Sequence, residues 1–510
     1  MKNKQLTLVV VSLLVVVLSV SLAWFTTQII GTGKEVSVTS ANLQIIFTDS
    51  DGALSATDIE PGWSATKTFT IQNNSKETYK YNIVIKDLVN TFTLDYLKYK
   101  ITSTNNGYNM TDYEVVPKSS TATDTILAYN VVIPKGETQT YTIEFKYPND
   151  ESVDQSADMN KKLGGTLFIT EGTEEPVTLL SQILKDNPTR GTRSNNNNGT
   201  NDFTTPLTAA TTGTLFTSTE NITGITDTPK EVYYYAGNTT NNWVKFANLY
   251  WRIIRTNHDG SIRLLYVGTS HDTTSGNIGT SAFNTNSDSP KYVGYKYGED
   301  TSLNTIRNNT TDSTIKTYID TWYQNTLTNY TKYLSTSAVY CNDRSEGTGQ
   351  TYSISSNFNF APYYKMDYYT DGETANPSYN CSDIRDAFSV DNTSAKLDYP
   401  VALMTADEIA FAGGVVYQEI STVPYAWFIN NSVGTQVSSD YWWSLSPLRW
   451  FDITAISWAW HFNHLSLTNL GVDNTCSVRP AISLKSCVKY SSGDGTASNP
   501  YTIEETTSGC

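Results

Sequence analysis

The side chains most capable of chemistry lie near the C-terminal end of the chain, where His461 and His464 follow Asp452. Imidazole and carboxylate groups can bind metal ions or transfer protons. The cysteines and histidines show no CxxC or HxxxH spacing, so we expect no zinc site. Glu408 could act as a general acid, but it follows Thr405 at the spacing of a helix capping box. We therefore expect no enzyme, no catalytic residue, no metal and no cofactor. A metal site at His461, His464 and Asp452 is the weaker alternative.

These histidines belong to a stretch of unusual composition. Tyr441-Trp-Trp-Ser-Leu-Ser-Pro447 opens it and Ser477-Val-Arg-Pro-Ala-Ile-Ser-Leu484 closes it, and between Tyr441 and Val478 the chain has no Lys, Glu or Gln. Five of the 11 Trp residues and two of the four His residues fall here. A solvated loop is not expected to carry so many aromatic side chains. Two interpretations stand: core strands of a β-rich domain, or a binding face framed by two structural strands.

Composition and charge narrow the class of protein. With 510 residues, the chain is long enough for two or three domains. Its formal net charge of −15 argues against a nucleic-acid partner, because binding to phosphates depends on Lys and Arg. Only 17% of the residues are charged whereas Tyr supplies 34, a composition typical of an extracellular β-protein with a neutral polar surface. The five cysteines leave at least one thiol free or paired outside the chain.

The N-terminus has the pattern of an export signal. Lys2 and Lys4 precede an apolar run from Leu6 to Phe25, and Ser21 and Ala23 suit the small-residue positions of a cleavage site. A run of this length could also span a bilayer. We expect residues 1–30 to be a signal peptide or a membrane anchor. The rest of the chain is then extracellular, either secreted or anchored to the cell surface.

Residues 31–175 are predicted to form an all-β domain. Apolar and polar residues alternate over 79–85 and 141–147, with turn signals such as Pro61-Gly62 between such runs. This pattern predicts an antiparallel sandwich. Four segments also resemble the TasA/camelysin family: Ser21-Leu-Ala-Trp-Phe-Thr26, Ser40-Ala-Asn-Leu43, Pro61-Gly-Trp63 and Phe69-Thr-Ile-Gln-Asn-Asn74. The resemblance implies a secreted jelly-roll of Gram-positive bacteria, and some members build extracellular fibres by strand donation.

Residues 176–228 lack periodicity and are rich in Asn, Thr, Gly and Pro, so we expect a flexible linker.

Residues 229–490 are predicted to form an α+β domain, with strands at Val232–Tyr235, Trp243–Phe246, Leu249–Arg255 and Ser261–Val267. An amphipathic helix is expected after Ser313. Its apolar face would consist of Ile315, Tyr318, Ile319, Trp322 and Tyr323. A second helix is expected to begin at the Thr405 capping box. Residues 491–510 are expected to be a C-terminal tail.

Among the cysteines, we expect Cys341 and Cys381 to pair across a Gly/Ser/Tyr-rich insertion. Closing so long a loop stabilises a fold by about 3–4 kcal/mol in the chain-entropy model. Cys476, Cys487 and Cys510 are not assigned by the sequence, and a Cys487–Cys510 bond is one option. We expect Arg479 to sit in a buried ion pair of the closing strand.

Residues 231–504 look like an uncharacterised domain family of Gram-positive surface proteins. The motifs that carry this resemblance are Tyr234-Tyr-Ala-Gly237, Asn241-Asn-Trp-Val-Lys-Phe246, Tyr250 to Leu264, Tyr292-Val-Gly-Tyr295, Tyr340-Cys-Asn-Asp-Arg344, Leu403 to Gly414, Tyr441 to Pro447, Val478-Arg-Pro480 and Gly493-Asp-Gly-Thr496. Their order is also similar to the C-type-lectin-like fold of formylglycine-generating enzymes and of the variable proteins of diversity-generating retroelements. The chain shows no cysteine spacing that supports the chemistry of the former.

The similarity to retroelement variable proteins implies a hypervariable ligand-binding face. Adenine-directed mutagenesis of Asn codons can produce most residue types found between Pro447 and Val478, but not Trp, Lys, Glu or Gln. The candidate face consists of Leu448, Arg449, Trp450, Phe451, Asp452, Ile453, Thr454, Ile456, Ser457, Trp458, Trp460, His461, Asn463, His464, Thr468, Asn469, Leu470, Asp473 and Cys476. The ligand would be a protein or glycan on another cell or phage. The alternatives are a structural fibre or matrix subunit, which could self-assemble through the first domain, and an enzyme related to formylglycine-generating enzymes.

Overall fold

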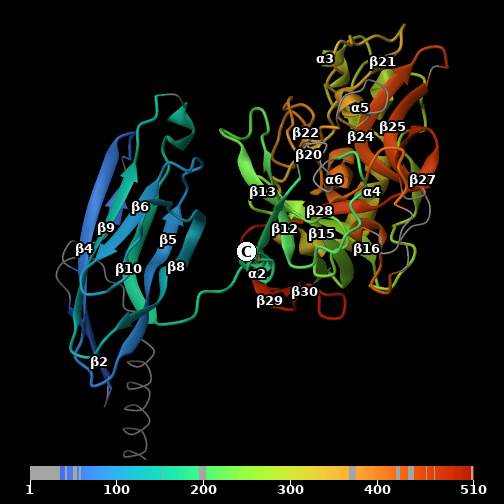
Figure 1. Ribbon diagram of the computed structural model, residues 1–510. Coiled ribbons are helices and arrows are strands. Elements are labelled where there is room, and N and C mark those ends of the chain that lie inside the picture. The colour runs from blue at the N-terminus through green and yellow to red at the C-terminus, as the bar shows by residue number, and fades with distance from the viewer. Residues whose placement is uncertain are drawn as a thin grey trace, which may run out of the picture. The chain divides into compact units, whose positions relative to one another are not determined.

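The computed structural model divides the chain into two compact units, Met1–Glu175 and Pro176–Cys510, each described by itself (Figure 1). The structure describes residues 35–40, 43–49, 54–56, 59–151, 153–193, 203–366, 375–420, 426–434, 441–454, 456–463, 466–506 and 509–510. The predicted export segment, residues 1–30, lies outside them. Within these ranges, no helix combines the length and apolar character needed to cross a bilayer.

The first unit consists of two antiparallel sheets. Its elements are β1 (Glu35–Ser40), β2 (Leu43–Asp49), β3 (Leu54–Ala56), β4 (Trp63–Asn73), β5 (Tyr79–Asn90), β6 (Lys98–Ser103), β7 (Glu114–Val115), β8 (Ser119–Ile133), β9 (Thr138–Tyr147), the 3-10 helix η1 (Gln155–Asp158) and β10 (Leu163–Glu171). One sheet has the order β1-β2-β4-β9-β6-β7 and the other β3-β10-β5-β8. The β-rich character predicted for this domain is therefore confirmed.

Alternating side chains of both sheets build the core of the first unit. Along β9, Tyr141, Ile143 and Phe145 are buried while their neighbours are more exposed, as the alternation in the sequence predicts. The buried hydroxyl of Tyr81, on β5 of the other sheet, lies 2.5 Å from that of Tyr141 and 2.6 Å from the side-chain oxygen of Gln139. These bonds satisfy polar groups that burial would otherwise leave without partners.

The second unit mixes helices with two large sheets. Its helices are α2 (Leu179–Asp186), α3 (Leu303–Ile306), α4 (Thr314–Thr326), α5 (Ala361–Met366) and α6 (Ala406–Ala412), with the 3-10 helices η2 (Pro290–Val293), η3 (Thr328–Tyr333) and η4 (Trp427–Ile429). Its strands are β11 (Thr189–Thr192), β12 (Thr214–Glu220), β13 (Lys230–Tyr234), β14 (Trp243–Phe246), β15 (Leu249–Thr256), β16 (Ile262–Gly268), β17 (Thr280–Ala282), β18 (Lys296–Tyr297), β19 (Thr311–Asp312), β20 (Tyr340–Cys341), β21 (Phe358–Asn359), β22 (Ala387–Phe388), β23 (Val401–Leu403), β24 (Trp442–Phe451), β25 (Ile456–Asn463), β26 (Ser466–Gly471), β27 (Thr475–Ser477), β28 (Pro480–Leu484), β29 (Tyr490–Ser492) and β30 (Tyr501–Ile503).

The larger sheet follows the order β11-β12-β13-β15-β14-β30-β29, and β16, β28 and β23 extend it from β15. The smaller sheet has the order β17-β27-β24-β25-β26, with β21 paired to β24. The strands expected near residues 232–267 appear as β13 to β16. The predicted helix after Ser313 is α4, and the Ser313 side chain accepts a hydrogen bond from the backbone N–H of Lys316. The Thr405–Glu408 capping box begins α6, and Gly413 ends it with a φ of +121°.

The prediction that residues 176–228 form a flexible linker is wrong for the part of this segment that the structure describes. This segment contains α2, β11 and β12, and β12 pairs with β13 of the larger sheet. Leu215 and Phe216 are buried in the core of the second unit. The Arg193 guanidinium donates to the carbonyls of Ala410 and Phe411 at the C-terminal end of α6, at 2.7 and 2.9 Å. Leu179 and Ile183 of α2 are buried at helical spacing, which the Asn- and Thr-rich composition of the rest of the segment obscured.

The predicted tail at residues 491–510 is also part of the second unit. β30 runs parallel to β14, pairing Val244 with Tyr501, and a disulfide joins Cys487 to Cys510. Cys341 and Cys381 form the other disulfide, which is the pair expected from the sequence. Cys476 is a buried free thiol.

A buried network of charges joins the larger sheet to α6. The Glu408 carboxylate accepts hydrogen bonds from Arg255, at 2.8 Å, from Arg263 and from the backbone N–H of Thr405. Arg255 also donates to Glu220 at 2.8 Å. Burial by itself raises the pKa of Glu220, but the neighbouring Arg255 guanidinium lowers it to about 2. The sequence pattern indicated the capping role of Glu408 but not this network.

Among the residues that the structure describes, Arg479 forms no ion pair, contrary to the prediction. Its guanidinium donates to the backbone carbonyls of Phe428 and Tyr266, at 2.7 and 3.3 Å, and lies 5.1 Å from the ring centroid of Trp442. Burial lowers the pKa of Arg479 to about 9. Carbonyl dipoles and an aromatic face therefore stabilise this cation where a carboxylate was predicted.

We predict that Glu220→Ala destabilises the second unit by about 3–5 kcal/mol, because it leaves Arg255 buried with one of its two carboxylates removed. The measurement is urea unfolding followed by tryptophan fluorescence, since nine of the 11 Trp residues lie in this unit. Folding lowers the pKa of Glu220 from 4.5 to about 2. The contribution of its charge to the free energy of unfolding is therefore present above pH 4.5 and is lost as the pH falls toward 2.

Glu231→Ala is the matched control, because Glu231 is exposed on the neighbouring β13. Equal unfolding midpoints for the two variants would contradict the structural role of Glu220.

Candidate functional site

The candidate binding face lies on an antiparallel meander of the smaller sheet. β24 pairs with β25, placing Arg449 opposite Trp458 and Phe451 opposite Ile456 (Figure 1). β25 in turn pairs with β26, placing Trp460 opposite Asn469. β24 continues four residues past Pro447, so the expected boundary between a structural strand and a recognition segment falls inside one strand.

Five residues predicted to form the face are instead core residues: Leu448, Trp450, Trp460, His461 and Cys476, whose exposed fractions do not exceed 3%. Leu448 and Trp450 lie on one side of β24, whereas the consecutive Trp460 and His461 point to opposite sides of β25. Both are buried, so β25 is covered on its two sides at this point. These side chains cannot contact a ligand without unfolding. For this half of the stretch, the interpretation as core strands is the correct one.

A cluster of four half-buried residues remains on the hairpin of β24 and β25. We call Arg449, Phe451, Ile456 and Trp458 the hairpin patch. The Arg449 guanidinium lies 4.3 Å from the ring centroid of Phe451 and 5.1 Å from that of Trp458, and the two ring centroids are 6.1 Å apart. Each contact restrains the rings and the cation in one arrangement.

The other predicted residues border the patch or lie on the neighbouring strand. The turn after β24 carries Asp452, half-buried, and the exposed Ile453 and Thr454; Ile453 is 87% exposed. On β26 and beyond, Thr468, Asn469 and Leu470 are half-buried and Asp473 is exposed. The side chains of Ser457, Asn463 and His464 lie outside the described residues.

Two residues that the sequence did not indicate, Asn357 and Tyr417, form hydrogen bonds with residues of the predicted face. The side chain of Asn357 accepts a hydrogen bond from the backbone N–H of Asp452 at 2.9 Å. The hydroxyl of Tyr417 accepts one from Asn469 at 2.6 Å, and its ring lies 6.5 Å from that of Trp460. Asn357 lies inside the loop closed by Cys341 and Cys381, and β21 of the same loop pairs with β24. Sequence patterns carry no signal for such contacts between distant segments.

The metal site proposed at Asp452, His461 and His464 is not supported. Asp452 follows the end of β24, whereas His461 lies five residues along β25 from Ile456, which corresponds to roughly 16 Å of extended strand. Ligands of one metal ion lie only a few ångströms apart. Burial lowers the pKa of His461 to about 4 and raises that of the Cys476 thiol to about 12. At neutral pH, His461 is therefore uncharged and Cys476 is not a thiolate.

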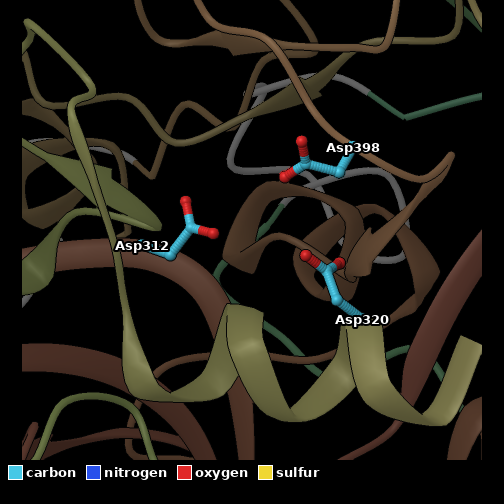
Figure 2. A group of neighbouring side chains, drawn as sticks. All are labelled: Asp312, Asp320 and Asp398. Atoms are coloured by element: carbon cyan, nitrogen blue, oxygen red, sulfur yellow. The ribbon is translucent and has the colours of Figure 1, made fainter.

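Elsewhere among the described residues, Asp312, Asp320 and Asp398 place their carboxylates together (Figure 2). The ammonium of Lys316, itself fully buried, lies 3.1, 2.5 and 2.7 Å from these three carboxylates in turn. The Lys316 ammonium, which α4 supplies, therefore already occupies the position where a metal ion would bind. We interpret the group as an ion cluster around the buried Lys316 ammonium, which fastens α4 to β19 and to the loop carrying Asp398.

The pKa shifts of this cluster agree with that interpretation. Burial by itself lowers the pKa of Lys316, but the carboxylates, Asp320 foremost, hold it above its ordinary value. The hydrogen bond from Lys316 lowers the pKa of Asp398. For Asp320 burial outweighs the attraction of Lys316, and its pKa is raised. Lys296, 3.0 Å from Asp312, adds a second cation beside the three carboxylates.

Comparisons with known proteins give no information about this site. No family model matches the chain, and no curated protein does. One similar solved structure carries the description "AvmM Catalyzes Macrocyclization in Alchivemycin A Biosynthesis", with 12% sequence identity and a TM-score of 0.14. The match covers 29% of this chain and 100% of that chain. A TM-score this low supports no inference about fold or activity.

We predict that Lys316→Met lowers the free energy of unfolding by about 1–3 kcal/mol, because it removes the ammonium that Asp320, Asp312 and Asp398 share. Calcium should leave the melting temperature of the unmodified protein unchanged and raise that of the variant, since an ion that binds only the folded state stabilises it. Differential scanning calorimetry with and without calcium measures both effects.

Lys230→Met, at an exposed lysine, serves as the control. If calcium stabilised the unmodified protein, the cluster would be a metal site and the ammonium a removable occupant.

Proposed function

We propose that this chain is an exported, non-enzymatic binding protein of a bacterial cell surface. The first unit would serve as a TasA-like jelly-roll scaffold, and the second as a C-type-lectin-like domain that presents the hairpin patch to a ligand. The observation that carries the proposal is the patch itself: a guanidinium held between two half-exposed aromatic rings on a strand pair whose other side is buried.

Several physical properties suit the hairpin patch to recognition. Arginine and large aromatic side chains dominate the binding energy of many interfaces. Their conformational freedom is already reduced by mutual contacts, so binding would cost less entropy. The neighbouring Ile453 exposes an apolar side chain that no core contact requires. The proposed ligand is a protein or glycan on another cell or on a phage.

One feature of the first unit favours a structural fibre or matrix role as a second candidate function. β8 spans Ser119–Ile133 and lies at the edge of its sheet. An edge strand offers backbone N–H and C=O groups to a strand of another chain. Assembly through this edge would be compatible with ligand binding by the second unit.

We further propose that the patch is diversified by a retroelement, as the resemblance to variable proteins implies. The expected observation is a reverse-transcriptase gene near the coding sequence, with a template repeat matching the codons for residues 441–484. Sequenced relatives should then differ at exposed or half-buried positions such as Arg449, Phe451, Ile453 and Asp473, and should retain Trp450 and Trp460, because changes at core positions impair folding. Variation spread equally over buried positions would contradict the proposal, as would the absence of a repeat.

Cell binding tests the proposed recognition face directly. The variant Phe451→Ser, Ile453→Ser, Trp458→Ser removes apolar contact area from the patch and its turn while leaving the buried core residues unchanged. We expect the labelled protein to bind target bacterial cells in flow cytometry, and the variant to lose about tenfold or more in affinity, since each anchor residue contributes on the order of 1–2 kcal/mol.

Val433→Ser is the matched control, because Val433 is an exposed apolar residue in the loop after η4, with an exposed fraction of 69%. Melting temperatures establish that the variants fold. Undiminished binding by the folded triple variant would exclude the hairpin patch as the binding face.

A further inference from the structure

A second surface of the second unit has the form of a ligand site: an open groove of about 670 Å³ along α4. One wall consists of successive turns of the helix, which present Thr317, Tyr318, Thr321 and Trp322. Tyr297 of β18 also lines the groove. The sequence predicts Tyr318 and Trp322 as part of the buried face of the helix. Both are instead half-buried, whereas the other members of that predicted face, Ile315, Ile319 and Tyr323, are fully buried.

The aromatic side chains of the groove are held in place. The Tyr318 hydroxyl donates to the carbonyl of Ile278 at 3.2 Å. The Trp322 ring makes edge contacts with Trp251 and Tyr266, at centroid distances of 6.4 and 5.5 Å. Rings fixed in this way keep an apolar surface available to a ligand without the loss of side-chain entropy that mobile rings would incur.

The polar groups of the groove are neutral hydroxyls and amides. Thr317, Thr321, Asn286 and Asn325 line it and are all exposed. Among the described lining residues, Asp312 alone is charged, and Lys296 and Lys316 neutralise it at 3.0 and 3.1 Å. The groove therefore has little electrostatic attraction for an ionic ligand, and its donors and acceptors suit a ligand with many neutral hydroxyl groups.

We propose that this groove binds a neutral oligosaccharide. A pyranose ring has C–H groups on its faces and hydroxyls around its edge, which match aromatic plates flanked by short amide and hydroxyl side chains. An extended peptide fits less well, because it requires free backbone groups of a strand edge, whereas the backbone N–H and C=O groups within α4 bond to one another. The volume lies within the range of small-molecule sites. This site is separate from the hairpin patch and does not depend on its function.

The test measures binding of cellotetraose, maltotetraose, xylotetraose, mannotetraose and chitotetraose to the full protein by saturation-transfer NMR and tryptophan fluorescence. Thr321→Arg fills the groove from an exposed position. The matched control is Thr328→Arg, because Thr328 is exposed and also donates to the carbonyl four residues before it, as Thr321 does, but does not line the groove. We expect saturable binding of at least one oligosaccharide that Thr321→Arg weakens about tenfold or more, and that Thr328→Arg leaves unchanged.

The triple variant of the hairpin patch should retain this binding, which separates the two sites. Absence of binding to all five oligosaccharides would overturn the proposal, as would binding that survives Thr321→Arg in a protein with an unchanged melting temperature. If binding were lost only in the triple variant, the saccharide would be assigned to the hairpin patch. That result would also overturn the proposal that the groove along α4 binds it.

Discussion

The second unit depends on the compensation of charge inside its core. Glu408 joins Arg255 and Arg263 of adjacent strands to the first turn of α6, and Glu220 completes the pairing of Arg255. Removing any one partner would leave an ion in a medium where its solvation costs several kcal/mol. These bonds therefore hold β12, β15, β16 and α6 in one arrangement. Lys316 and its three carboxylates fasten α4 by the same principle.

This compensated core allows the unit to present aromatic residues at its surface. The strands β24 and β25 bury Trp450 and Ala459, and the same backbone displays Phe451 and Trp458 on the opposite side. The proposed recognition face is thus small, and its rigidity comes from the buried half of the same strands. The groove along α4 uses a similar arrangement, because Ile315 and Ile319 anchor the helix from which Tyr318 and Trp322 project.

Much of the fold could be predicted because its signals are local. Alternation along residues 141–147 places one side of β9 in the core, and the Thr405 and Ser313 caps mark two helix starts through bonds spanning three residues. The segment 176–228 could not be predicted in this way. Its buried Glu220 pairs with Arg255, 35 residues further along the chain, and a composition rich in Asn and Thr does not reveal that pairing.

The sequence by itself determined that the chain is β-rich, that Ser313 and Thr405 cap α4 and α6, and that residues 441–484 contain an unusual concentration of aromatic side chains. Only the tertiary structure decided which of those side chains face the core and which face solvent. Strand periodicity gives two sides, but bulges between Trp443 and Arg449 shift the register, so counting residues does not identify the exposed side. That choice follows from packing against β26, which comes next in the chain, and against β21 and α5, which the sequence places far before β24.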